Sequence, residues 1–211
     1  MDHVQQGDHG KGMRVFDDRL RDVQRSLDRD IALPPDGIAL TRTRFGLGLV
    51  TTREVRAGEA IYRSDWFTVP DVEHALVVRT PVDGQVETLT ITRMHSVRYR
   101  DTRTFDVPGC FMNHSCDPTS MSIDLVVDGA DEVTLYEQVA LVDLAPGDPV
   151  TCDYTLFDWD CDGHQFTCSC GAVDCYGRVE GFQGLPPATQ ARLLDRITYA
   201  SAHGWALQHG H

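Results

Sequence analysis

The sequence predicts a mainly β protein with one helix near each end of the chain. Between Gly37 and Tyr154, short runs rich in β-branched residues alternate with turns that contain Gly and Asp, which is the pattern of antiparallel hairpins. No helical segment separates these runs, so the pattern excludes parallel βαβ units. Amphipathic patterns before and after this region predict the two helices.

Three hairpins are expected in the central region. Phe45-Gly46 separates "GIALTRTR" from "LGLVTTREV", "PVDG" separates "ALVVRT" from "QVETLTI", and "DGAD" separates "SIDLVV" from "EVTLYEQVAL". The first helix is expected from Val15 to about Ile31, where "LPPDG" ends it, and it should pack on the main domain through Phe16, Leu20, Val23, Leu27 and Ile31. The last is expected from Pro187 to His203, with Leu193, Leu194 and Ile197 on its inner face.

The composition of the 211-residue chain fits one globular domain, with 41% hydrophobic and 24% charged residues. No apolar run approaches the roughly 18 residues that span a membrane, and the N-terminus lacks the pattern of a signal peptide. We therefore expect a cytoplasmic protein with reduced thiols and no membrane association. The net charge of -13 argues against unspecific nucleic-acid binding, and it suits a basic partner or simply solubility.

Cys168, Cys170 and Cys175 have the spacing C-x-C-x4-C, with Gly171 available for a tight turn. Zinc in a structural site takes four ligands, so a fourth must come from elsewhere in the chain. The candidates are Cys116, Cys110, Cys152, Cys161 and a histidine such as His164, and spacing does not choose among them. The alternative is a set of unlinked buried cysteines.

Three other stretches carry candidate chemistry. "RFGLGL" contains Gly46-Leu47-Gly48 in a hairpin turn, and no helix follows to make it a dinucleotide fingerprint. "GCFMNHSCDP" gathers polar groups at a predicted strand end, although a turn at Asp117-Pro118 would explain them equally. "PVTCDYTLFDWD" places Tyr154 at another strand end, where a tyrosine at the edge of the core is the simpler interpretation.

The order of these stretches resembles the SET-domain lysine methyltransferase family with its post-SET zinc-binding segment. The resemblance covers roughly Gly37 to Gly181, and "FMNHSCDP" and "CSCGAVDC" are its specific motifs. It implies a β-clip (SET) fold of small curved sheets with a pseudoknot. The expected division is a tail and helix at 1–36, a SET domain at 37–160, a post-SET zinc segment at 161–184, and a helix and tail at 185–211.

The resemblance also implies roles for individual residues. S-adenosylmethionine would lie against the backbone of Gly46, Leu47 and Gly48 and the pair Asn113-His114, and an aromatic such as Tyr176 or Phe182 would cover its adenine. Tyr154 would be the catalytic tyrosine. Cys116 would complete a structural Zn²⁺ site with Cys168, Cys170 and Cys175, thereby ordering one wall of the active site.

The chain departs from the family at two positions. Cys152 replaces the usual Phe or Tyr two residues before the catalytic tyrosine, and Cys110 replaces a common arginine. A small residue at 152 leaves room for a water, further methyl groups or a different acceptor, and a catalytic thiol is a minor alternative.

The expected function is transfer of methyl groups from S-adenosylmethionine to lysine side chains of a protein, with a basic protein or peptide as substrate. The alternatives are the same chemistry on a small molecule or free amino acid, and an inactive zinc-stapled interaction module.

Overall fold

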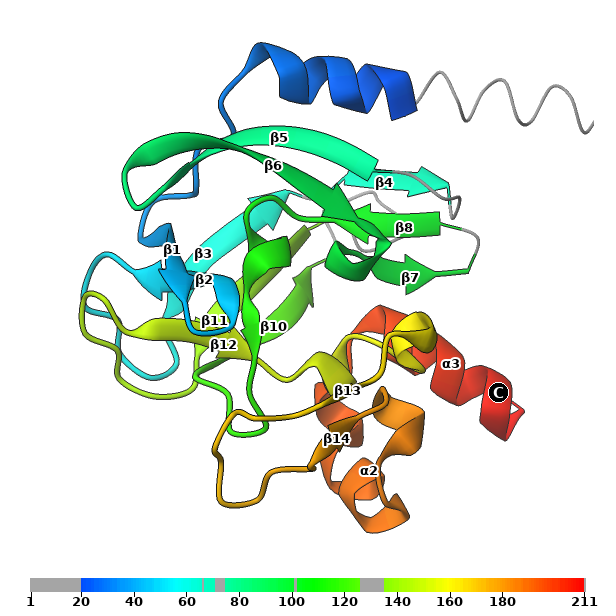
Figure 1. The fold of residues 1–211 in the computed structure, drawn as a ribbon. Helices are drawn as coiled ribbons and strands as arrows, with labels where there is room; N and C mark the ends of the chain where they lie inside the picture. Colours follow the sequence, from blue (N-terminus) through cyan, green and yellow to red (C-terminus); the bar gives the residue numbers. More distant parts are fainter. Residues whose placement is uncertain (1–19, 66, 71–74, 101, 126–134, 211) are drawn as a thin grey trace, which may run out of the picture.

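A computed structural model describes residues 20–65, 67–70, 75–100, 102–125 and 135–210 of the chain (Figure 1). The predicted mainly β class is confirmed, because the described residues form several small sheets with helices at the two ends. The strands are β1 Ile38–Thr43, β2 Gly46–Thr51, β3 Ala60–Asp65, β4 Phe67–Pro70, β5 Ala75–Val82, β6 Gln85–Thr92, β7 Val97–Tyr99, β8 Thr102–Phe105, β9 Asn113–His114, β10 Ser120–Leu125, β11 Leu135–Ala140, β12 Pro149–Cys152, β13 Phe166–Thr167 and β14 Arg178–Val179.

The largest sheet has the strand order β6-β5-β1-β2-β12-β9. Its hairpins β1–β2 and β5–β6 are antiparallel and join at the predicted turns. In β5, alternate side chains are buried, as expected of a strand with one face on the core. The short strand β9 ends this sheet and runs parallel to β12, although 34 residues, including β10 and β11, lie between His114 and Pro149.

Two three-stranded sheets complete the main body, with the orders β10-β11-β3 and β4-β8-β7. The predicted pairing of β10 with β11 is confirmed from Ser120–Ala140 to Leu125–Leu135, and the residues of its turn lie outside the described ones. One core cluster joins the sheets; its fully buried members include Leu40, Leu49, Ile61, Val78 and Phe105.

The N-terminal helix covers residues 20–29 and lies along β5 (Figure 1). Leu20, Val23 and Leu27 pack against the core, as predicted. The side chain of Gln24 adds two hydrogen bonds to the backbone of Val77, at 2.8 and 2.9 Å. The prediction is wrong for Ile31, which follows the helix and is 38% exposed. Val15 and Phe16 lie outside the described residues.

The single C-terminal helix predicted from Pro187 to His203 is wrong. Two helices, α2 Pro187–Leu193 and α3 Tyr199–His209, are joined by the 3₁₀ turn η6 Leu194–Arg196. Thr198 has extended backbone (φ -73°, ψ 168°), which ends any continuous helix and starts α3. Leu193 is buried and Ile197 half-buried, as predicted, but Leu194 is 37% exposed.

Five further 3₁₀ turns connect the strands: η1 Arg93–His95, η2 Gly109–Phe111, η3 Tyr154–Leu156, η4 Cys161–Gly163 and η5 Phe182–Gly184. The C-terminal helices form a second core with this region, in which Leu156, Phe182, Leu185 and Leu193 are buried. None of the described helices is long and apolar enough to cross a membrane.

Candidate active site and metal site

The segment from Asn113 to Cys116 lies at the centre of the site. Asn113 is opposite Thr151 and His114 is opposite Cys152 in the β9–β12 pair, and the Ser115 N–H donates to the Cys152 carbonyl at 2.9 Å. Because η3 follows β12 directly, this pairing brings Asn113 and His114 beside Tyr154. The structure thus gathers residues that are some 40 positions apart in the sequence.

Asn113 is anchored to the edge of β2. Its amide nitrogen donates to the Leu47 carbonyl at 3.0 Å and approaches the Thr43 hydroxyl at 3.4 Å. Gly48 permits this approach, because a Cβ added there would lie 2.5 Å from the Asn113 Nδ2 atom and 2.8 Å from Thr43. Gly46 has a different role: its φ of +102° forms the turn between β1 and β2.

His114 is held as a neutral imidazole with a defined tautomer. Its side chain is 4% exposed, and burial lowers its pKa, opposed by the Asp153 carboxylate 3.8 Å away. The Nδ1 atom accepts a hydrogen bond from the Tyr154 backbone N–H at 3.1 Å, so the ring proton is on Nε2. That atom lies 3.3 Å from the Cys116 sulfur and can donate to it.

Tyr154 begins η3 and is packed by aromatic rings. Its ring centroid lies 5.3 Å from His114 and 6.1 Å from Phe166. The hydroxyl donates to the Met112 carbonyl at 2.5 Å. Burial, with the neighbouring Cys152 and Cys110 thiols, raises the Tyr154 pKa, so the hydroxyl keeps its proton and acts as a donor.

A cavity of about 970 Å³ adjoins these residues. Leu47, Asn113, His114, Cys152 and Tyr154 line it, whereas Gly46 and Gly48 do not. Its volume lies at the upper end of the range for small-molecule sites. The turn η1 and residues 161–170 also line it, so the cysteine-rich segment forms part of its wall.

Neither aromatic residue predicted to cover the adenine lines the cavity. Phe182 is fully buried in the C-terminal core, and the Tyr176 hydroxyl donates to Asp153 at 2.7 Å. The aromatic that the post-SET segment contributes to the wall is Phe166, whose ring lies 5.7 Å from His114. Phe166 lies two residues before Cys168, so its proximity to the predicted metal ligands was visible in the sequence.

Cys152 is a buried thiol with a raised pKa, for which burial is the main cause and the Asp153 carboxylate the second. A thiolate is therefore disfavoured, which counts against a catalytic thiol. Cys110, whose pKa is raised by burial and by Asp106, lines the same cavity.

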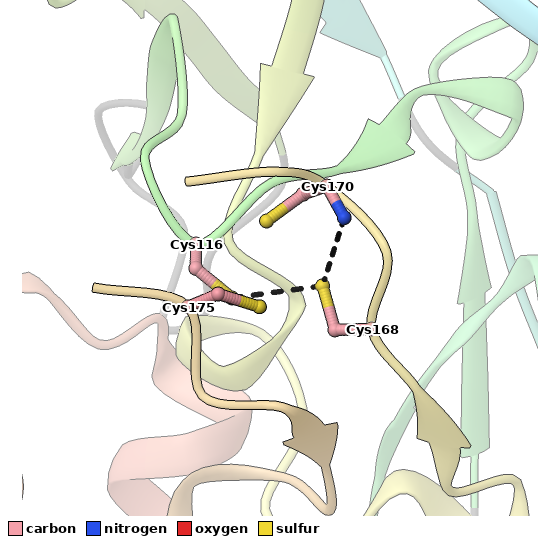
Figure 2. A group of neighbouring side chains, drawn as sticks. All are labelled: Cys116, Cys168, Cys170 and Cys175. Atoms are coloured by element: carbon pink, nitrogen blue, oxygen red, sulfur yellow. Dashed lines mark hydrogen bonds between the residues drawn. The ribbon is translucent and has the colours of Figure 1, made fainter. Parts of the chain in front are cut away.

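The four sulfurs of Cys116, Cys168, Cys170 and Cys175 lie within 4.8 Å of one another (Figure 2). The Cys116 sulfur is 3.7 Å from that of Cys168 and 3.8 Å from that of Cys175. These separations are far longer than a disulfide and equal the roughly 3.8 Å edge of a tetrahedron with Zn–S bonds of about 2.3 Å.

Each of these sulfurs also accepts a backbone N–H, from Tyr176, Cys170, Ala172 and Gly177, at 3.4 to 3.5 Å. Such N–H groups stabilise negative charge on sulfur, which is the form that binds metal. The donor set thus fits a tetrathiolate zinc site. Of the candidates for the fourth ligand, Cys116 joins the loop, whereas Cys110, Cys152, Cys161 and His164 stay outside the group.

An ion-pair cluster that the sequence did not reveal holds the wall between η1 and η4. Arg103, 1% exposed, pairs with Asp162, which also accepts from Arg93 at 2.8 Å. Arg98 bonds Asp160 at 2.8 Å and lies 3.3 Å from Asp162. The partners are about 60 residues apart, and no local pattern marks them.

Comparison with known proteins gives the family. The model of the SET domain matches residues 46–155. The mouse histone-lysine N-methyltransferase NSD3 is 30% identical over 156 residues, which are 74% of this chain and 10% of that protein. The H3 lysine-4 specific histone-lysine N-methyltransferase of Kluyveromyces lactis is 33% identical over 67 residues, 32% of this chain and 6% of that protein.

This chain therefore spans a tenth or less of the length of these relatives. Among solved structures, a proposed histone methyltransferase of Plasmodium falciparum aligns with 57% of this chain and 95% of its own, at 13% identity and a TM-score of 0.42. The match to residues 46–155 covers more than half of the chain and contains Asn113, His114, Cys116 and Tyr154. The protein belongs to the SET domain family.

Proposed function

We propose that this protein transfers methyl groups from S-adenosylmethionine to the side-chain amine of lysine in a protein substrate. The observation that carries the proposal is the convergence of Asn113, His114 and Tyr154 on one cavity beside the edge of β2. A protein that only binds a partner would not need these three side chains in one cavity. Family membership supports methyl transfer, and the histone-lysine methyltransferases among the relatives favour a protein substrate.

The backbone of Gly46, Leu47 and Gly48 in β2 and the pair Asn113-His114 in β9 are proposed to hold the cofactor. S-adenosylmethionine, when bound, supplies an electrophilic methyl group on a cationic sulfur. The Asn113 amide offers a donor and an acceptor, and its carbonyl oxygen can accept from an ammonium group. Hydrogen bonding of Asn113 and His114 to the backbone fixes both side chains before any ligand arrives.

Tyr154 is the proposed catalytic residue. Its protonated hydroxyl can donate beside the reacting groups, and its ring, packed by His114 and Phe166, fixes the geometry. A free lysine amine is only about 0.4% neutral at pH 8, so the acceptor must lose its proton in the site. The buried, largely apolar surroundings of Tyr154 favour the neutral amine by desolvation.

The four cysteines are proposed to bind one structural Zn²⁺. The metal would join the loop after β13 to the segment that carries Asn113 and His114. Because residues 166–170 line the cavity, ordering this loop completes one wall of the site. The ion would have no open position for substrate, since all four ligands are thiolates.

The proposal is tested with methyl-labelled S-adenosylmethionine, purified protein and lysate from its own source. S-adenosylhomocysteine should form, and the label should enter macromolecules. Tyr154→Phe should lower turnover by about 10²-fold or more, since one positioned hydroxyl is lost, while cofactor affinity stays within about twofold. Tyr99→Phe, on β7 against α3 and outside the cavity lining, is the matched control. Unchanged turnover in Tyr154→Phe would remove this residue from the mechanism.

A small amine or free amino acid is the second candidate acceptor. The observation that favours it is the pair of small thiols, Cys110 and Cys152, on the cavity wall next to Tyr154. Small side chains leave room for an acceptor of another shape. Label confined to the low-mass fraction would support this candidate. If the protein binds the cofactor but methylates nothing in the lysate, neither the protein acceptors nor the small acceptors supplied are substrates.

A further inference from the structure

Asp106, Tyr136 and Tyr62 form a buried cluster, here called the Asp106 cluster. The Tyr136 hydroxyl donates to the Asp106 carboxylate, and the Tyr62 hydroxyl lies 3.0 Å from Tyr136 and 3.4 Å from Asp106. All three residues are less than 9% exposed. Asp106 and Tyr136 line the cavity, whereas Tyr62 does not.

The cluster is locked to the turn that leads into Asn113. The Cys110 N–H donates to the Asp106 carbonyl at 2.7 Å, and the Asp106 carboxylate lies directly over Gly109, where any Cβ would overlap it. Burial, followed by the Asp106 charge, raises the pKa of both tyrosines, so both hydroxyls keep their protons for donation. The result is a rigid carboxylate that two tyrosine hydroxyls orient.

Its position relative to Tyr154 follows from the shared neighbours. The Tyr154 hydroxyl donates to the Met112 carbonyl, the Met112 N–H donates to the Gly109 carbonyl at 2.9 Å, and the Asp106 carboxylate lies over Gly109. The turn η2 therefore joins the tyrosine to the cluster. Leu47, Asn113, Tyr154, the thiols of Cys110 and Cys152, and Asp106 all line the same cavity.

We infer that Asp106 and Tyr136 form the inner end of the acceptor site and bind the ammonium group of a methylated amine. This inference rests on the proposed methyltransferase function. In each transfer the nitrogen lone pair forms an N–C bond while the C–S bond breaks and its electron pair goes to sulfur, which leaves a cationic nitrogen. A mono- or dimethylated nitrogen then releases a proton to solvent, whereas a trimethylated one keeps its charge.

A fixed carboxylate attracts the cationic nitrogen that each transfer leaves, and the small thiols leave space for the added methyl groups. The pocket should therefore favour di- and trimethylated amines, which large neutral side chains in the same positions would not. Asp106 and Tyr136 would be specificity-determining residues, since they contact the acceptor without taking part in the bond exchange.

The first test is the distribution of mono-, di- and trimethylated product, measured by mass spectrometry with Asp106→Asn and Tyr136→Phe. Both variants should lower the ratio of trimethylated to monomethylated product about tenfold, the effect of losing about 1.4 kcal/mol of charge attraction. Tyr99→Phe is the control, because its ring packs against Tyr199 of α3 and does not line the cavity, and it should change this ratio less than twofold. Tyr136→Phe keeps the inference testable if Asp106→Asn does not fold.

The second test does not depend on turnover. Trimethylammonium chloride and the neutral isostere tert-butanol are titrated into the wild-type protein and followed by ligand-observed NMR. Wild type should prefer the cation, and Tyr136→Phe should weaken this preference. If no acceptor is methylated but the preference exists, the proposed function fails and the subsite stands. Equal binding of both probes, unchanged product ratios, or loss of S-adenosylmethionine affinity in Asp106→Asn would overturn the inference.

Discussion

A side chain at Gly48 would push Asn113 away from β2, because the Asn113 amide packs directly against this glycine. Its backbone is not in the left-handed region, so alanine there meets only a steric cost, from Asn113 and Thr43. Gly48→Ala should displace the Asn113 amide and weaken S-adenosylmethionine binding about tenfold or more, because a fixed polar contact is lost. Isothermal titration calorimetry measures the affinity, and thermal unfolding should show a loss of about 1 to 3 kcal/mol.

Gly84→Ala provides the control for this prediction. Gly84 lies in the β5–β6 turn with φ +77° and open space around it, so alanine strains the backbone without touching the site. It should cost about 1 kcal/mol of stability and leave cofactor affinity unchanged. Equal affinity losses in the two variants would mean that stability, not the Asn113 contact, governs binding.

The loop after β13 is the element whose order should depend on a metal. We expect one zinc per chain by elemental analysis, and removal by a strong chelator should expose backbone amides of residues 166–177 to hydrogen exchange. Cys170→Ser should lower the zinc content and the cofactor affinity together, because the same loop lines the cavity.

Cys161→Ser is the matched control for the metal prediction. Its thiol belongs to the 3₁₀ turn η4, is buried, and lies outside the group of four sulfurs. Zinc content should therefore stay at one per chain. A zinc-free wild-type protein with a protected loop would contradict the structural role of the metal.

The acidic turn between η3 and η4 gives a pH prediction. Burial raises the pKa of Asp158 to about 6, Asp160 adds to this, and Arg103 opposes it. An aspartate of the unfolded chain titrates near 3.9, so the folded state holds this proton more tightly. The contribution of Asp158 to stability is then fully present at acid pH and falls as pH rises from about 4 to about 6.

Asp158→Asn should accordingly stabilise the protein at pH 7 by about 1 kcal/mol, a value reduced because the side chain is partly exposed, and should have little effect at pH 4. Chemical denaturation at the two pH values measures the difference. Asp195→Asn, on the exposed turn η6, controls for the loss of one negative charge. A variant that is less stable at pH 7 would show that the carboxylate is needed in its charged form.

At the scale of the whole molecule, sequence reasoning succeeded where contacts are local. The hairpins β1–β2 and β5–β6 were predictable because their alternation and turn residues lie within fewer than 20 positions. The break between α2 and α3 was missed, since the spacing of Leu193, Leu194 and Ile197 also fits one helix. The extended backbone of Ile197 and Thr198 distinguishes the two cases.

Long-range contacts needed other information. Spacing alone left the fourth cysteine open, and Cys116 was named only through the family resemblance; the structure places its sulfur beside three that follow 52 to 59 positions later. Asp106 and Tyr136, 30 positions apart, and Arg103 and Asp162, 59 apart, had no signal in the sequence. Their pairing depends on how the small sheets pack, which residue patterns do not encode locally.

Net charge is a property of the whole chain and gives the last prediction. A charge of -13 should attract an acceptor peptide rich in Lys and Arg, and salt screens this attraction over a Debye length of about 10 Å at 0.1 M. The kcat/KM for such a peptide should fall about tenfold between roughly 0.05 and 0.5 M salt, mainly through KM. A neutral peptide with a single lysine is the control and should change far less. If both peptides respond equally, the acidic surface serves solubility and the acceptor is recognised inside the cavity, where the Asp106 cluster would provide the charge that matters.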